Sequence, residues 1–169
     1  MKEKLIQAYM DTAERFAELS HARRLHVGAI VVKDDRIISI GYNGMPAGWD
    51  NNCEDQVWDS GAGGWLDPDE FYAKYPYEGW HEGAQRNVRY ALKTKPEVLH
   101  AESNAIAKLA KSSESGRDAS IFITHAPCIN CAKLIYQSGI SSVYYRNSYR
   151  DLAGVEFLTK SGIEVTKTE

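Results

Sequence analysis

Cysteine, long apolar runs and basic clusters are scarce in this chain, and each scarcity excludes a class of protein. Only three of the 169 residues are cysteines, too few for a disulfide-stabilised scaffold, so a reducing, cytoplasmic environment is expected. No apolar run reaches the roughly 18 residues of a membrane-spanning helix, and the first residues lack the apolar core of a signal peptide. A membrane partner is therefore not expected.

The charge balance argues against nucleic acid as the main partner. The formal net charge is −3 and no basic run occurs, whereas a phosphate backbone attracts a clustered basic surface. Hydrophobic residues make up 43% and charged residues 25% of the chain, which is ordinary for a globular protein. A chain of this length is most simply one domain, residues 1–169, with a single substantial core.

Two short motifs bring together the donors of a metal site. His100-Ala101-Glu102 is followed by Pro127 and by Cys128 and Cys131, which are three residues apart and so share one face of a helix. A cysteine pair alone could be a redox pair or half of a structural zinc site, and a lone H-x-E motif occurs by chance. Together they predict a catalytic zinc site, because three protein ligands leave a fourth position for water.

In this interpretation His100, Cys128 and Cys131 bind one zinc ion, and Glu102 acts as the base that moves the protons of the water. Thiolates at a helix N-terminus are stabilised by the exposed N–H groups, and Pro127 suits the first turn of such a helix. The order H-x-E, then P-C-x-x-C, is the signature of zinc-dependent nucleobase deaminases.

Hydrophobic periodicity predicts alternating helices and strands, and therefore a three-layer α/β domain. The expected strands are 27–33, 36–42, 120–124, 142–145 and 163–167, and the expected helices are 2–18, 100–111, 128–138 and 152–160. A further short helix is expected within 82–93. Periodicity stops from 43 to about 80, where a long aromatic-rich loop is expected. Such a loop is either a lid or subunit contact, or an insertion that packs on its own aromatic side chains.

Three segments carry a resemblance to a known family. Residues 41–48 read G-Y-N-G-M-P-A-G, residues 100–106 read H-A-E-S-N-A-I, and residues 124–133 read T-H-A-P-C-I-N-C-A-K. The chain thereby resembles deoxycytidylate (dCMP) deaminases. The resemblance implies a cytidine-deaminase-like α/β/α fold with a mixed five-stranded sheet, and an insertion at about 49–99. It also implies hydrolytic deamination of dCMP to dUMP and ammonia for thymidylate supply.

The same resemblance implies which residues bind the substrate. Asn43 would hold the deoxyribose 3′-hydroxyl, Tyr149 would stack on the base, and Arg24, helped by Ser20, would bind the 5′-phosphate. The remaining pocket positions would be Ala101, His125 and Ala126, with backbone near the last two accepting from the amino group. A turn asparagine, a half-buried tyrosine and an exposed loop arginine are the structural alternatives.

A regulatory site is a second implication of the resemblance. The segment Gly41-Tyr42-Asn43-Gly44, with Arg150, would bind a nucleoside triphosphate, dCTP as activator and dTTP as inhibitor, together with Mg²⁺, in a homohexamer. A simple strand-end turn is the structural alternative for the same four residues.

One zinc per chain is expected. Some members of that family bind a second, structural zinc through a cysteine before the segment Val27-Gly28-Ala29 and another after the G-Y-N-G segment. Here Ala22 stands at the first place and Cys53 near the second. Histidines at 21, 26 and 81 could substitute, but solvent-exposed histidines and a free thiol are the simpler interpretation.

Three alternative functions stay open. The enzyme could deaminate dCTP as well as dCMP, or it could act on single-stranded nucleic acid, for which the aromatic loop could supply stacking surfaces. A non-catalytic zinc module that binds nucleotides is a third alternative. Glu102 argues against it, because a protein that only binds has no use for that carboxylate.

Overall fold

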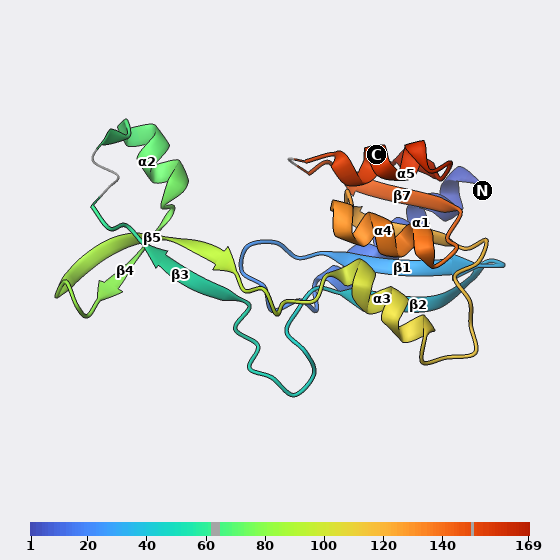
Figure 1. The fold of residues 1–169 in the computed structure, drawn as a ribbon, viewed down its shortest axis with the longest axis horizontal. Helices are drawn as coiled ribbons and strands as arrows, with labels where there is room; N and C mark the ends of the chain where they lie inside the picture. Colours follow the sequence, from blue (N-terminus) through green and yellow to red (C-terminus); the bar gives the residue numbers. More distant parts are fainter. Residues whose placement is uncertain (62–64, 150) are drawn as a thin grey trace.

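A computed structural model describes residues 1–61, 65–149 and 151–169, and it contains two separate sheets (Figure 1). The larger sheet has five strands in the order β2-β1-β6-β7-β8, and the smaller has three in the order β3-β5-β4. The large-sheet strands are β1 (Gly28–Lys33), β2 (Arg36–Tyr42), β6 (Ser120–His125), β7 (Ser142–Asn147) and β8 (Glu164–Lys167). Its helices are α1 (Glu3–Ala17), α3 (Ala101–Leu109), α4 (Ile129–Gln137) and α5 (Ala153–Lys160).

The large sheet is mixed, as expected. Strands β1 and β2 form an antiparallel hairpin across Asp34 and Asp35, whose φ angles of 49° and 56° match a tight two-residue turn. Strand β1 pairs antiparallel with β6, whereas β6, β7 and β8 run parallel. The two parallel connections are made by α4 and α5, because parallel neighbours require a crossover.

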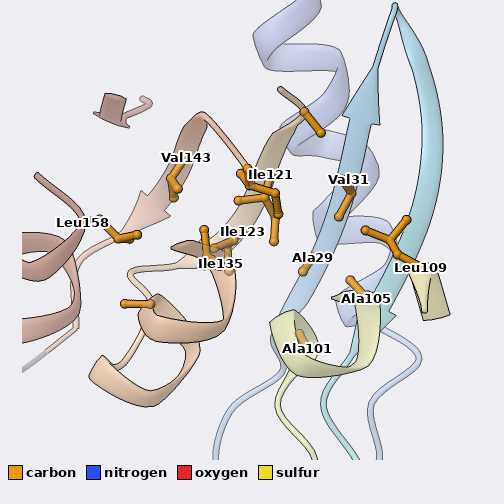
Figure 2. Packing of buried hydrophobic residues seen from close by; sticks show 13 residues of the cluster. Ala29, Val31, Ala101, Ala105, Leu109, Ile121, Ile123, Ile135, Val143 and Leu158 are labelled. Atoms are coloured by element: carbon orange, nitrogen blue, oxygen red, sulfur yellow. The ribbon is translucent and has the colours of Figure 1, made fainter. Parts of the chain in front are cut away.

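Alternate side chains of the central strands enter two different cores, which gives the fold its three layers. Ile30 and Val32 point toward α1 and pack with Met10 and Phe122. Their neighbours Ala29 and Val31 point to the other face, where α3, α4 and α5 lie. That core contains residues from all three helices, among them Ala105, Ile135 and Leu158 (Figure 2). The predicted α/β/α architecture is therefore confirmed.

The stretch from 43 to about 80, expected as a loop, contains regular structure. With the residues that follow, it forms the small antiparallel sheet of β3 (Glu54–Trp58), β4 (Tyr77–His81) and β5 (Arg86–Thr94), together with the short helix α2 (Pro68–Lys74). The helix predicted within 82–93 is wrong, because this stretch is a turn followed by β5. Val88 and Leu92 are its buried residues, and a spacing of four fits one face of a strand as well as one face of a helix.

Aromatic side chains hold the small sheet together. The Trp58 ring lies against the Tyr90 ring, with 4.8 Å between their centroids. The Tyr77 ring also stacks on Tyr90, with 5.4 Å between centroids. Arg89 lies over the Tyr72 ring of α2 at 4.4 Å. The segment thus packs on its own aromatics, which was one of the two alternatives. Within residues 1–61, 65–149 and 151–169, no helix is long and apolar enough to span a bilayer.

Candidate active site

The predicted metal ligands meet at the N-termini of two helices. His100 is the N-cap of α3, Cys128 is the N-cap of α4, and Cys131 follows in the first turn of α4. Their donor atoms all lie within 4.8 Å of one another, the one such group of three among the residues that the structure describes. Because α4 begins at Ile129, Pro127 precedes the cap and does not occupy the first helical turn.

The distances between these donor atoms suit a tetrahedral zinc ion. The Nδ1 atom of His100 lies 3.7 Å from the Cys128 sulfur and 3.4 Å from the Cys131 sulfur. Ordinary zinc–sulfur and zinc–nitrogen bond lengths at a tetrahedral angle place two such donors about 3.6 Å apart. One imidazole and two sulfurs are also a donor set that zinc prefers, with one position left for a non-protein ligand.

The electrostatics of the group favour a cation. Hydrogen bonds from Cys131 and His100 lower the pKa of Cys128 to about 3, so this sulfur is a thiolate at neutral pH. The pKa of Cys131 is raised, first because its thiol donates to Cys128 and then by burial. The hydrogen bond to Cys128 also raises the pKa of His100. A bound cation replaces these protons and allows both sulfurs to be thiolates.

Glu102 occupies the first turn of α3 and is only 4% exposed. Burial raises the pKa of its carboxyl, and its own backbone N–H and the nearby His100 offset part of that effect. A carboxylate with a raised pKa is a better proton acceptor near neutral pH than an exposed one. Glu102 therefore has the environment of a general base.

A cavity of about 340 Å³ opens over this group. Its lining contains nine of the residues predicted from sequence: Arg24, Asn43, His100, Ala101, Glu102, His125, Ala126, Cys128 and Tyr149. Cys131 lies behind them, 3% exposed. Ser20 is not in the lining. It is buried, and its hydroxyl accepts a hydrogen bond from the Ala22 backbone N–H, so it shapes the loop that carries Arg24.

Asn43 is held by the same loop. Its side-chain oxygen accepts from the Val27 N–H at 2.8 Å, and its side-chain nitrogen donates to the Leu25 carbonyl at 2.9 Å. Asn43 therefore joins the end of β2 to the loop before β1. This structural role resembles the turn role that was considered as an alternative to substrate binding. Elsewhere in the lining, the Ala126 N–H donates to the Asn147 carbonyl, and Tyr149 is 45% exposed.

The proposed regulatory segment has a structural role at both glycines. A Cβ on Gly41 would lie 2.1 Å from the Ala101 carbonyl oxygen, so glycine here allows β2 to pack directly on α3. Gly44 exchanges two backbone hydrogen bonds with Leu99, the residue before His100. The fifth residue predicted for this site, Arg150, lies outside the described residues.

Three polar or close-packed contributors stand out among the site residues that were not predicted. Glu54 and Thr94, which are paired across β3 and β5, line the cavity from the small sheet. Gly154 in α5 packs against the ligand loop, where a Cβ would lie 2.1 Å from the Pro127 carbonyl oxygen. No local pattern marks these residues, because each acts through a contact with a segment distant in sequence.

Comparisons with known proteins agree with this geometry. The model of the cytidine and deoxycytidylate deaminase zinc-binding region matches residues 3–147. The chain belongs to the cytidine and deoxycytidylate deaminase family. Within the family, it is 35% identical to the deoxycytidylate deaminase of enterobacteria phage T4 over 162 residues, which cover 82% of this chain and 77% of the phage protein.

Two further members of the family are similar over most of the chain. The Homo sapiens deoxycytidylate deaminase is 35% identical over 147 residues, which cover 85% of this chain and 65% of the human protein. A crystal structure of the dCMP deaminase of cyanophage S-TIM5, in complex with dCMP and dUMP, is 40% identical with a TM-score of 0.76 and covers 99% of both chains. The zinc-binding deaminase domain predicted from the two motifs is thus confirmed.

Proposed function

We propose that this chain catalyses the hydrolytic deamination of dCMP to dUMP and ammonia. The observation that carries the proposal is a single cavity lined by the His100 and Cys128 ligands, by the buried Glu102 carboxylate, and by Arg24 and Asn43. The metal ligands and Glu102 would act on the cytosine ring. The Arg24 guanidinium and the Asn43 amide would contact the sugar and phosphate of the nucleotide.

Glu102 carries the proton transfers in this proposal. It accepts one proton from the water that attacks C4 of cytosine and delivers it to ring nitrogen N3. It then takes the proton of the new C4 hydroxyl and delivers it to the amino group, so that ammonia leaves as the C4 carbonyl forms. Zinc held by His100, Cys128 and Cys131 would supply a Lewis acid that lowers the pKa of that water. Burial of Glu102 supports its role, because a raised pKa lets one carboxyl both accept and donate near neutral pH.

Recognition of the nucleotide is assigned to residues of the cavity wall. Tyr149 stacks on the base, and Asn43 contacts the 3′-hydroxyl. Arg24 binds the 5′-phosphate, because the planar guanidinium can donate two hydrogen bonds to one phosphate group. Ala101, His125 and Ala126 line the region around the amino group. The membership of all six in one lining supports these roles. Ser20 contributes indirectly, through its hydrogen bond to the Arg24 loop at Ala22.

Regulation at the G-Y-N-G segment is a second part of the proposal. A triphosphate with Mg²⁺ would bind there, dCTP raising and dTTP lowering activity, in a homohexamer. The two hydrogen bonds between Gly44 and Leu99 support a coupling between this segment and the metal site, because Leu99 directly precedes the ligand His100. The close packing of Gly41 against Ala101 supports it as well, since α3 also carries Glu102.

Ammonia release tests the proposal directly. The zinc-loaded protein is assayed in parallel with dCMP, CMP, cytidine and dCTP, each with and without added dCTP–Mg²⁺ or dTTP. We expect turnover of dCMP, raised by dCTP and suppressed by dTTP. Turnover of dCTP itself would mean a broader phosphate pocket. Release from none of the four would contradict the proposal, and single-stranded DNA would then be assayed as substrate. Sedimentation of the same sample gives the number of subunits.

A further inference from the structure

The small sheet meets the large one at a buried carboxylate. Glu54, the first residue of β3, is 1% exposed, although β3 is otherwise largely exposed. Its carboxylate accepts from the backbone N–H of Arg23 at 3.0 Å and from that of Arg24 at 3.2 Å. The Arg23 side chain adds an ion pair at 3.6 Å and also reaches the Glu54 carbonyl. Glu54 therefore fixes the backbone of a loop that belongs to the large sheet.

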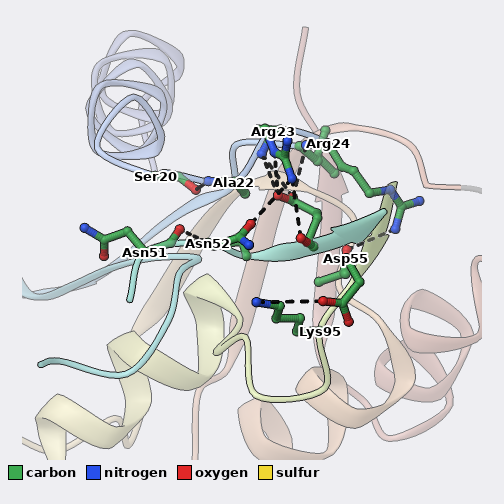
Figure 3. Close-up of polar contacts among 12 residues, drawn as sticks. Ser20, Ala22, Arg23, Arg24, Asn51, Asn52, Asp55 and Lys95 are labelled. Atoms are coloured by element: carbon green, nitrogen blue, oxygen red, sulfur yellow. Dashed lines mark hydrogen bonds and ion pairs between the residues drawn. The ribbon is translucent and has the colours of Figure 1, made fainter. Parts of the chain in front are cut away.

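Arg24 is held at a second point by the same pair of strands. Its Nη1 atom donates to the Thr94 hydroxyl at 3.0 Å, and Thr94 is the register partner of Glu54 across β3 and β5. Figure 3 shows Arg23 and Arg24 together on one side of the start of β3, and Asp55 and Lys95 on the other. The small sheet thus holds Arg24 at its backbone and at the tip of its side chain.

The charges of this junction leave the Arg24 guanidinium positive toward the cavity. The Glu54 carboxylate is paired with the Arg23 side chain, and Arg24 meets a hydroxyl, which carries no charge. Glu54, Thr94 and Arg24 all line the cavity that contains the metal ligands. A guanidinium held in one orientation binds a phosphate more tightly than a mobile one, because less side-chain freedom is lost on binding.

From these contacts we propose that Glu54 and Thr94 are positioning residues that set the preference of the enzyme for phosphorylated over unphosphorylated substrate. They act by orienting Arg24 and do not touch the reacting atoms. The small sheet of residues 54–94 is then one wall of the substrate site. This inference rests on the proposed function, in which Arg24 binds the 5′-phosphate of dCMP.

The test compares dCMP with deoxycytidine, which lacks only the phosphate. The variants are Glu54→Gln and Thr94→Val, assayed for ammonia release with zinc content and circular dichroism measured for each. We expect the KM for dCMP to rise about tenfold, the effect of losing one hydrogen bond to a charged group. We expect kcat for dCMP and kcat/KM for deoxycytidine to stay within about twofold of wild type. Thr94→Ser, which keeps the hydroxyl, restores the wild-type KM.

Two controls separate positioning from general stability. Asp55→Asn removes an ion pair between β3 and Lys95, the residue that follows β5, and is expected to leave turnover of both substrates unaffected. In an Arg24→Ala background, Thr94→Val should cause no further loss with dCMP, because the group that it orients is gone. If Glu54→Gln does not fold, the Thr94 variants and the Arg24 background decide the question.

The outcomes distinguish this inference from the proposed function. A parallel loss with dCMP and deoxycytidine would show a merely structural role and overturn the inference. An unchanged KM for dCMP in Thr94→Val would overturn it as well. In both cases wild-type turnover of dCMP leaves the proposed function in place, whereas a wild-type protein that does not deaminate dCMP overturns the function itself.

Discussion

Individual side chains in the cavity divide between those that react and those that hold other groups. The three predicted metal ligands lie within 4.8 Å of one another, and Glu102 lines the same cavity. The H-x-E and C-x-x-C spacing was sufficient to predict their positions at two helix N-termini. Asn43 and Ser20 were predicted as substrate contacts, with a turn role as the alternative for Asn43, and both make hydrogen bonds that shape the loop around Arg24. A polar residue can do both, and single substitutions separate the two roles.

Replacement of the buried carboxylate should remove catalysis and leave the metal in place. We expect Glu102→Gln to lower kcat by at least about a hundredfold, because the amide cannot take up the proton of the water. Zinc content, measured by atomic emission, should stay at one ion per chain, since Glu102 is not among the three grouped ligands. Turnover equal to wild type would contradict the assignment of Glu102 as base.

The half-exposed tyrosine at the edge of the cavity should contribute mainly to binding. Stacking of a base on an aromatic side chain contributes about 1–3 kcal/mol, so we expect Tyr149→Ala to raise the KM for dCMP by about fivefold or more. Tyr149→Phe keeps the ring and should keep the KM. A KM that rises equally in both variants would indicate that the hydroxyl, and not the ring, makes the contact. Initial rates over a range of dCMP concentrations measure both.

Helices and strands place these side chains through close backbone contacts. Strand β2 lies on α3 at Gly41, and α5 lies on the ligand loop at Gly154, in each case where a Cβ would lie 2.1 Å from a carbonyl oxygen. The two helices thereby hold the loop and helix termini that carry the metal ligands. Gly154 is the second residue of α5, and the close approach to the Pro127 carbonyl, rather than helix propensity, requires glycine at this position.

A methyl group at the α5 contact should therefore disturb the metal site from a distance. We expect Gly154→Ala to lower the free energy of unfolding by about 1–3 kcal/mol, because the backbone at Pro127 and Cys128 must move. Zinc should also be lost more readily to a chelator. Thr159→Ala, on the exposed side of the same helix, is the matched control. Urea unfolding and competition with a chromogenic chelator measure the two effects. Equal stability of both variants would contradict the close contact.

The molecule as a whole consists of a three-layer body and a small sheet that extends from it (Figure 1). The connection is not a simple linker. It includes the Glu54 junction and a small buried cluster of Ala22, Cys53 and Val98. Ala22 and Cys53, the positions considered for a second metal, therefore belong to one apolar cluster. The expectation of one zinc per chain stays a prediction.

Because the junction is buried, the chain should unfold as one unit, which would agree with a single domain of residues 1–169. We expect a single calorimetric transition of the zinc-loaded protein, with equal calorimetric and van't Hoff enthalpies. Two resolved transitions would show that the small sheet melts independently and would contradict the single-domain prediction.

Removal of the metal should lower the stability of the whole molecule. A ligand that binds only the folded state shifts the unfolding equilibrium, and the three ligands join α3 to α4. We expect a chelator to lower the melting temperature and excess zinc to restore it. The Cys131→Ser variant should have the lower melting temperature from the start, and this temperature should change less when chelator or zinc is added. An identical melting temperature with and without zinc would contradict a metal link between the helices.

Local patterns were sufficient for the elements of the large sheet and for the metal site, while long-range contacts decided the rest. Helix and strand periods, the Asp34–Asp35 turn and the spacing of His100, Glu102, Cys128 and Cys131 are all encoded within short stretches. The small sheet was missed because spacings such as that of Val88 and Leu92 fit both helix and strand. The roles of Glu54, Thr94 and Gly154 depend on partners far along the chain, and only the tertiary structure brings those partners together.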